Sequence, residues 1–242
     1  MLSGVGTSWI HASPGDNCAL ARQNKGRMTT STPDPAVQPR YPRDDVTGVI
    51  LAGGLARRMG GVDKGLVELA GRPMVEHVLD ALRPQVGPIL INANRNLDRY
   101  SAYGYPVIDD TLPGYLGPLA GMLSAMQRLA TGYLVTVPCD APRLAPDLVS
   151  RLFDAGVTNG ADVAVATDGR RQQPVFLLLR AGLTPALESY LAGGGRRVDT
   201  WLAQLRLVEA DFSDAPDTFI NVNDPAERQR LEATLPSATG LH

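Results

Sequence analysis

The chain has 242 residues, which is enough for one α/β domain with a full hydrophobic core and short for two. A hydrophobic fraction of 44%, a charged fraction of 20% and a net charge of −2 are ordinary for a soluble globular protein and provide no basic field for nucleic acid. No apolar run approaches the roughly 18 residues that span a bilayer, and no basic segment followed by an apolar core opens the chain. We therefore expect a cytoplasmic protein that binds neither nucleic acid nor membrane.

Cysteine and histidine positions argue against several kinds of site. Cys18 and Cys139 are far apart, and Cys18 lies in a stretch with no sign of a fold, so both are expected to be free thiols. His11, His77 and His242 show neither the spacing of metal ligands nor the pattern of a Ser/His/Asp triad. Hydrolysis through a nucleophilic side chain therefore has no support in the sequence.

The first 45 residues are rich in proline, serine, threonine and aspartate and show no sustained period of 2 or 3.6 residues. Such segments bury too little apolar surface to fold, so we predict a disordered N-terminal extension over 1–45, a domain over 46–235 and a disordered tail over 236–242. Met28 opens the run MTTSTPDP, and translation starting there is a hypothesis. Mass spectrometry of the native N-terminus tests it, and a first peptide containing Trp9 would contradict it.

Short apolar runs alternate with helical patterns from Val46 onward. In chain order, strands are predicted at 46–52, 88–93, 105–109, 133–139, 162–167 and 174–179, and helices at 119–129, 145–153 and 225–231. Strands that alternate with helices require crossover connections. They predict a single Rossmann-like α/β domain with a mainly parallel central sheet and helices on both faces. In such sheets, ligands bind outside the carboxyl ends of the strands.

A glycine-rich loop follows the first predicted strand. The strand runs into Gly53 and Gly54, and Arg57, Arg58 and Lys64 follow. Glycines allow a sharp turn and bring backbone N–H groups close to phosphate oxygens, where a side chain would collide. The loop matches neither GxxxxGK[ST] nor GxGxxG, so it is neither a P-loop nor a dinucleotide fingerprint. A tight turn without a ligand is the alternative, and the positive charges favour phosphate binding over it.

The motifs LAGG (51–54), RRMGG (57–61), DKG (63–65) and GRPM (71–74) occur in this order. Together they resemble the signature loop of the molybdenum cofactor guanylyltransferases. That family lies among the nucleotidyltransferases, which include the sugar-nucleotide pyrophosphorylases. Gly54 is the discriminating position, because related enzymes, among them the cytidylyltransferase acting on the same pterin, usually read LAAG. The resemblance extends over residues 46–232 or so.

The resemblance implies that the terminal phosphate of molybdopterin attacks the α-phosphorus of GTP and that pyrophosphate leaves, with Mg²⁺ as cofactor. It assigns nucleotide binding to Leu51, Ala52, Gly53, Gly54, Lys64, Asn92, Asp110 and Asp140. It assigns catalysis to Arg58, Lys64 and Asp140, the metal to Asp140, and the pterin side to Asn221 and Asn223.

Each of these matches also has a purely structural interpretation. Taken alone, Asn92 is as readily a turn residue, and Asp110 a helix cap. Asp140 is the stronger signal, because a strand ending in Pro-Cys-Asp delivers one carboxylate to the sheet edge, where a hard cation on phosphate oxygens would need it. Asn221 and Asn223 would face one side of an extended segment, or could belong to a turn.

Other features leave alternatives open. The turn GGGRRV (193–198) either binds the pterin phosphate or ends a helix, with its arginines in solvent. The same chemistry with another nucleotide or acceptor would make the protein a cytidylyltransferase or a sugar-phosphate nucleotidyltransferase. A non-catalytic GTP-binding cofactor carrier is the alternative from another class, and the presence of Asp140 argues against it.

Partners follow from the resemblance alone. The substrates would be GTP and molybdopterin, and the protein would contact the protein that supplies molybdopterin and the molybdoenzymes that receive the product. The sequence itself shows no interface, and we expect a monomer.

Overall fold

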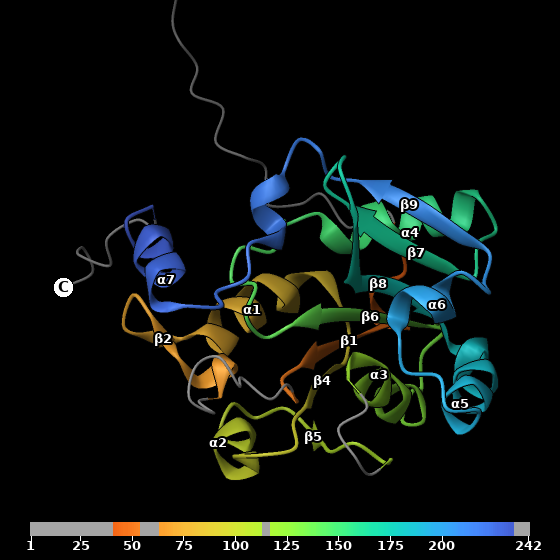
Figure 1. Cartoon of the computed structure of the whole chain (residues 1–242), viewed down its shortest axis with the longest axis horizontal. Coiled ribbons are helices and arrows are strands. Elements are labelled where there is room, and N and C mark those ends of the chain that lie inside the picture. The colour runs from red at the N-terminus through yellow and green to blue at the C-terminus, as the bar shows by residue number, and fades with distance from the viewer. Residues whose placement is uncertain (1–40, 54–62, 113–116, 235–242) are drawn as a thin grey trace, which may run out of the picture. The chain divides into compact units, whose positions relative to one another are not determined.

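Seven strands form the central sheet of the protein, whose computed structural model describes residues 41–53, 63–112 and 117–234 (Figure 1). Their bounds are β1 (Val46–Leu51), β4 (Ile89–Asn92), β5 (Val107–Ile108), β6 (Tyr133–Pro138), β7 (Val163–Thr167), β8 (Gln172–Arg180) and β9 (Leu207–Asp211). The strand order is β5-β4-β1-β6-β8-β7-β9, and β8 alone runs antiparallel to its neighbours in this sheet. A separate hairpin pairs β2 (Glu68–Leu69) with β3 (Arg72–Pro73).

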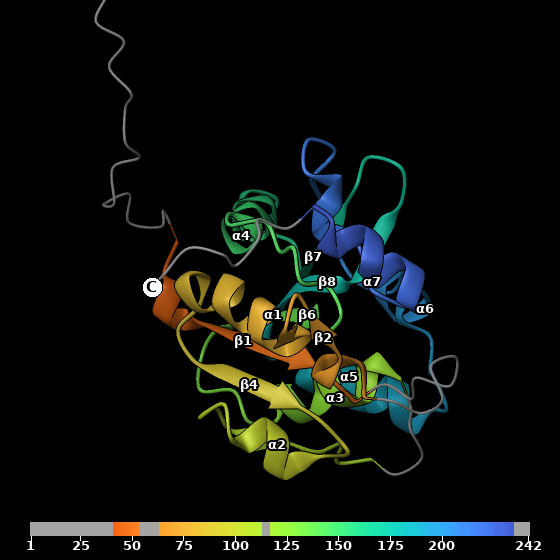
Figure 2. The same ribbon diagram turned by 90° about the vertical axis from the view of Figure 1, so that its left-hand side faces the viewer.

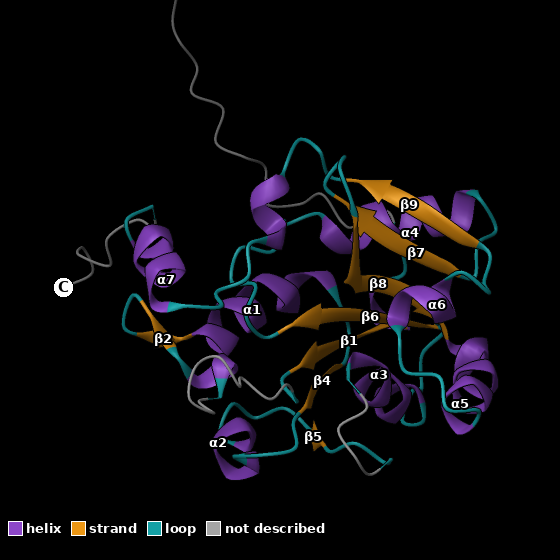
Figure 3. Cartoon of the chain, in the orientation of Figure 1, coloured by secondary structure: helices purple, strands orange, loops and turns teal. Residues whose placement is uncertain are grey.

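Helices lie on both sides of the sheet (Figure 3). The α-helices are α1 (Met74–Leu82), α2 (Leu97–Ser101), α3 (Pro118–Met126), α4 (Leu148–Thr158), α5 (Thr184–Ala192), α6 (Val198–Leu202) and α7 (Pro225–Glu232). Short 3₁₀ turns are η1 (Arg43–Asp45), η3 (Lys64–Leu66), η4 (Arg83–Gln85), η5 (Ala181–Leu183) and η6 (Pro216–Phe219). The predicted fold class is confirmed. Among the described helices, none is long and apolar enough to cross a membrane.

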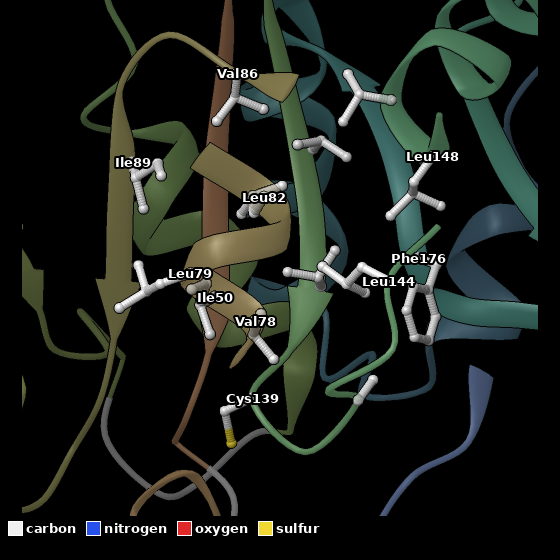
Figure 4. Packing of buried hydrophobic residues seen from close by; sticks show 14 of the residues in the cluster. Ile50, Val78, Leu79, Leu82, Val86, Ile89, Cys139, Leu144, Leu148 and Phe176 are labelled. Carbon is white, nitrogen blue, oxygen red and sulfur yellow. The ribbon is translucent and has the colours of Figure 1, made fainter. Parts of the chain in front are cut away.

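Two hydrophobic cores sandwich the sheet because side chains alternate along each strand. On β1, Ile50 packs with α1 and α4, whereas Val49 packs with α3, α5 and α6. Figure 4 shows the first core, with Val86 at one end and Cys139 at the other. The sheet is therefore buried on both faces, which leaves the ends of its strands as the places where polar groups can gather.

All six predicted strands occur, with small shifts at their ends. The predicted helix 119–129 ends early, at Met126, and the helix predicted at 145–153 begins only at Leu148 and continues to Thr158. Strand β9 was not predicted, because its sequence LVEAD carries two acids and only three apolar residues. It pairs in parallel with β7, and that pairing supplies what its composition lacks.

Residues 41–45 pack onto the domain, although their composition placed them in the N-terminal extension. Tyr41 is only 6% exposed, packs its ring on Phe153 and donates a hydrogen bond to the backbone oxygen of Gln85. Arg43 Nε donates to the oxygen of Val86 at 2.8 Å. Proline and aspartate around Tyr41 conceal this contact in the sequence. The predicted extension at 1–40 and the predicted tail lie outside the described residues.

Gln85 connects η4 to the start of α4 through buried hydrogen bonds. Its Nε2 donates to the oxygens of Ala81 and Ala145, both at 2.9 Å, and its Oε1 accepts from the N–H of Val149 at 3.0 Å. We expect Gln85→Leu to lower the free energy of unfolding by roughly 2–4 kcal/mol, because three backbone groups lose this partner, two of them from buried hydrogen bonds. Urea unfolding measures this change. The same substitution at the exposed Gln127 should cost less than about 0.5 kcal/mol.

Candidate active site

The polar site lies where four neighbouring parallel strands, β5, β4, β1 and β6, end at one level. The register pairs Leu51 of β1 with Asn92 of β4 and with Pro138 of β6, and Asn92 with Ile108 of β5. Figure 2 shows β1 and β4 side by side with their arrowheads at the same end. Strands far apart in sequence thus deliver their next residues to one edge, as the Rossmann-like prediction requires. Gly54 and Arg58, two of the predicted site residues, lie outside the described residues.

One cluster at this edge contains Lys64, Asp140 and Asn223. Lys64 Nζ lies 2.8 Å from Asp140 Oδ2 and 2.6 Å from Asn223 Oδ1. The Asp140 side chain is 11% exposed and that of Lys64 is 26% exposed, so solvent screens this ion pair only in part. Three predicted site residues from the loop, the end of β6 and the segment before α7 therefore meet.

The start of α7 holds Asn223 in this cluster. Asp224 caps the helix by accepting from the N–H of Glu227 at 2.8 Å, and Glu227 Oε2 in turn accepts from the N–H of Asn223 at 2.7 Å. The N–H of Val222 donates to the oxygen of Asp140 at 3.0 Å, which joins this segment to the end of β6. Asn221 does not share the bonding of Asn223: its buried Oδ1 has no hydrogen-bond partner among the described residues.

A second cluster contains Asn92, Asn94 and Asp110. Asn92 Nδ2 donates to Asp110 Oδ1 at 3.0 Å, and Asn94 Nδ2 donates to Asp110 Oδ2 at 2.8 Å. Asn94 Oδ1 also accepts from the N–H of Asp110 at 2.9 Å. Asn94 was not predicted as a site residue. Its position two residues after Asn92 was the available signal, since this spacing repeats a side-chain direction in extended backbone.

The second cluster lies against the glycine-rich loop and α3. A Cβ atom on Gly53 would lie 2.8 Å from Asn94 Nδ2, and one on Gly121 would lie 2.2 Å from Asn92 Oδ1. Ala52 continues the pairing of the loop with β4 by donating its N–H to the oxygen of Asn92 at 2.7 Å. A Cβ atom at either position would therefore collide with one of the two asparagine side chains, and the loop's first residues border both asparagines.

Gly121→Ala should displace the buried Asn92 and weaken by about ten-fold the binding of GTP, the nucleotide that the resemblance implies, with a loss of roughly 1–3 kcal/mol in the free energy of unfolding. Calorimetric titration and urea unfolding measure the two effects. Gly156→Ala is the matched control, because Gly156 is also helical and a Cβ there would meet only ordinary contacts at 3.6 and 3.8 Å. It should bind GTP as the wild type does, and an equal weakening by both variants would contradict the expectation.

Cys139 lies beside Asp140 but is no candidate nucleophile. Burial, followed by the negative charges of Asp140 and Asp63, raises the pKa of its thiol well above the ordinary value. The thiol therefore stays protonated, and only the thiolate is nucleophilic. This agrees with the absence of support for hydrolysis through a side chain.

The donor atoms of the first cluster suit a hard cation. Asp140 Oδ2 and Asn223 Oδ1 converge on one positive atom, Lys64 Nζ, so two oxygens of the kind that Mg²⁺ prefers already face a common point. No group of three or more His, Cys, Asp or Glu side chains suited to a metal occurs in the described part of the chain. A single carboxylate is sufficient for Mg²⁺ when substrate phosphates and water complete its shell.

The arginines of the turn at 193–198 have local partners. Arg196 Nη1 donates to the oxygens of Leu191 and Gly195 at 2.8 and 2.5 Å, and Arg197 forms two hydrogen bonds with Asp199 at 3.0 and 2.5 Å. Cations that bind the last carbonyl oxygens of a helix stabilise its C-terminus. Of the two interpretations left open, the turn that ends a helix is the one these bonds favour.

Known proteins match most of the chain. Residues 48–208 match the family described as the MobA-like NTP transferase domain. A molybdenum cofactor guanylyltransferase from Shewanella loihica is 51% identical over 190 residues, which cover 78% of this chain and 97% of the relative. One from Shewanella woodyi is 53% identical over 190 residues with the same coverage.

Solved structures share the fold. The molybdopterin-guanine dinucleotide biosynthesis protein A from Archaeoglobus fulgidus superimposes with a TM-score of 0.66 at 24% identity, over 77% of this chain and 97% of that one. A CMP:2-keto-3-deoxy-manno-octonic acid synthetase complexed with CTP superimposes with a TM-score of 0.56 at 12% identity, over 78% and 96%. Because the family match covers residues 48–208 and the sequence relatives are about half identical over most of both chains, the chain belongs to the molybdenum cofactor guanylyltransferase family of MobA-like NTP transferases.

Proposed function

We propose that this protein transfers GMP from GTP to molybdopterin, with or without bound molybdenum, and releases pyrophosphate. The observation that carries the proposal is the convergence of Lys64, Asp140 and Asn223 at the carboxyl edge of the sheet, where Leu51, the first residue of the glycine-rich loop, pairs with Pro138. The guanylyltransferase relatives, at about half identity, supply the identity of nucleotide and acceptor. Physical reasoning alone supports the broader class, a nucleotidyltransferase.

The reaction places few covalent demands on the protein. A phosphate oxygen of molybdopterin bonds to the α-phosphorus of GTP, and the bond from that phosphorus to the bridging oxygen of the β-phosphate breaks. In the loop at 51–54, the N–H groups of Gly53 and Gly54 would hold the triphosphate, because the N–H of Ala52 already donates to the oxygen of Asn92. Lys64 and Arg58 would neutralise the triphosphate and the leaving pyrophosphate. The phosphate nucleophile is already anionic at neutral pH, so no general base is needed. Alignment of the two substrates supplies much of the acceleration.

Mg²⁺ is the cofactor we propose for the site. Asp140 would hold it, with Asn223 as a second oxygen ligand. When bound, it would neutralise charge on the phosphate oxygens. Lys64, released from its bonds to these two residues, would then be free to turn toward the triphosphate. On the nucleotide side, Asn92 and Asp110 would contact the guanine-bearing nucleotide, and Asn94 would hold Asp110 in place.

Several further features are proposed on the family's account. Asn221 and Asn223 would lie toward the pterin. The protein would act in the cytoplasm as a monomer, receive molybdopterin from a supplying protein, and pass the product to recipient molybdoenzymes.

Pyrophosphate release separates the candidate functions. Purified protein with Mg²⁺ is incubated with GTP or CTP, and with molybdopterin or a sugar 1-phosphate as acceptor. Release should require GTP and molybdopterin together, and it should stop when EDTA removes the metal and resume when Mg²⁺ is restored. Release with CTP, or with the sugar phosphate, would favour the other nucleotidyltransferases. Binding of GTP without any release would favour the cofactor carrier, and a titration with the four nucleoside triphosphates tests base choice directly.

A further inference from the structure

The residue before Lys64 is buried and anchored to a different element. Asp63 is 7% exposed, and its carboxylate accepts from the Tyr100 hydroxyl at 2.5 Å and from Asn96 Nδ2 at 2.9 Å. Tyr100 lies in α2 and Asn96 is the N-cap of that helix, whereas Lys64 is the first residue of η3. Burying a carboxylate is costly unless it is hydrogen-bonded, so these two donors hold Asp63 strongly in place.

The donors are themselves held. Tyr100 is fully buried, and burial, with Cys139 and Asp63 nearby, raises the pKa of its hydroxyl above the ordinary value. It therefore remains a donor. Asn96 adopts a left-handed backbone conformation (φ 51°, ψ 36°). Its backbone oxygen accepts from the N–H groups of Arg99 and Tyr100 at 3.0 and 3.1 Å. Few residues other than glycine adopt this conformation, and asparagine is among those that do.

The residue after Lys64 is confined on the same side. A Cβ atom on Gly65 would lie 2.5 Å from the Tyr100 hydroxyl oxygen and 3.2 Å from the Cys139 Cβ. The backbone of η3 is thus inserted between α2 and the residue that follows β6, and Asp140 comes directly after that residue. Lys64 lies between an anchored carboxylate and a glycine in tight contact, and its side chain leads to Asp140 and Asn223.

We propose that Tyr100, through its hydrogen bond to Asp63, is a positioning residue that holds η3 so that Lys64 Nζ reaches the Asp140 carboxylate. A lysine side chain is long and flexible, so Nζ could occupy many positions if the backbone of Lys64 could also move. Anchoring the adjacent backbone restricts that range. The catalytic consequence rests on the proposed function, because it requires Lys64 to act on the phosphates.

Tyr100→Phe removes one hydroxyl and retains the ring, so it is the direct test. The chain has only two lysines, Lys25 and Lys64, so selective ¹³C-lysine labelling yields two Cε signals, which Lys25→Arg assigns. In Tyr100→Phe, the Lys64 signal should shift and sharpen as the side chain gains mobility. Tyr103→Phe, three residues on and packed against the same core, is the matched control and should leave the signal in place.

Turnover provides the second readout. Tyr100→Phe should lower it about ten-fold in the wild-type background. In the Lys64→Ala background, the same substitution should change turnover by less than about two-fold, because no charge remains to be misplaced. A general structural role would reduce turnover equally in both backgrounds, and that result would overturn the proposal.

The failure of the positioning role is distinguishable from the failure of the proposed function. An unchanged Lys64 signal in Tyr100→Phe would overturn the positioning role whatever the turnover. A shifted signal with unchanged turnover would support the role of Tyr100 in positioning Lys64 and would overturn the assignment of Lys64 to the reaction.

Discussion

Asp140→Ala should abolish guanylyl transfer, by about 1,000-fold or more, while the protein remains folded. The carboxylate accepts from Lys64 Nζ at 2.8 Å and is the proposed metal ligand, so its loss removes both the group that would hold Mg²⁺ and the partner that fixes the positive charge of Lys64. Single-turnover pyrophosphate release measures the effect, and circular dichroism checks the fold.

Two further variants make this result specific to the site. Asp140→Asn keeps the shape of the side chain and removes its charge, so it should be nearly as inactive as the alanine variant. Asp147→Ala removes an exposed carboxylate from the loop after β6 and should retain activity. Near-normal magnesium-dependent turnover by Asp140→Asn would remove the Asp140 charge from the mechanism.

Lys64→Ala should reduce the rate of transfer by about 10²–10³-fold, or roughly 2.7–4 kcal/mol, the typical cost of losing one preorganised electrostatic donor. Lys64 Nζ lies at the sheet edge beside Asp140 and Asn223, so once Mg²⁺ takes its place on their oxygens, a short movement of the side chain would bring its charge to the phosphates. The rate constant with both substrates saturating is the quantity to compare, since a loss confined to GTP binding would appear in KM instead.

Arg83→Ala is the control for the loss of a positive charge as such. Arg83 lies in η4, its side chain is 64% exposed, and it is paired with Asp80 on the surface. Its removal should leave the rate within about two-fold, because solvent screens exposed charges strongly. An unchanged rate constant for Lys64→Ala would remove Lys64 from the proposed mechanism.

Strong local patterns made most of the fold predictable. Six of the seven strands of the central sheet stand out as apolar runs, and the helical face at Leu119, Met122 and Leu123 is fully buried in the second core. Strand β9 was missed because its place depends on pairing with β7, a partner about 40 residues earlier in the sequence. Tyr41 was missed for a similar reason, since a single aromatic contact leaves no period.

The sequence by itself determined the fold class, the glycine-rich loop and the residues that follow each strand, because these depend on residue type and local spacing. Only the tertiary structure decided which of those residues meet. Lys64 bonds to Asn223, which lies 159 positions away, and Asp63 bonds to Tyr100, which lies 37 positions away. Such contacts are set by strand register and helix packing, which no local pattern encodes. The tertiary structure also distinguished Asn223, whose side chain accepts from Lys64, from Asn221, whose Oδ1 has no partner among the described residues, although the two appear equivalent in the sequence.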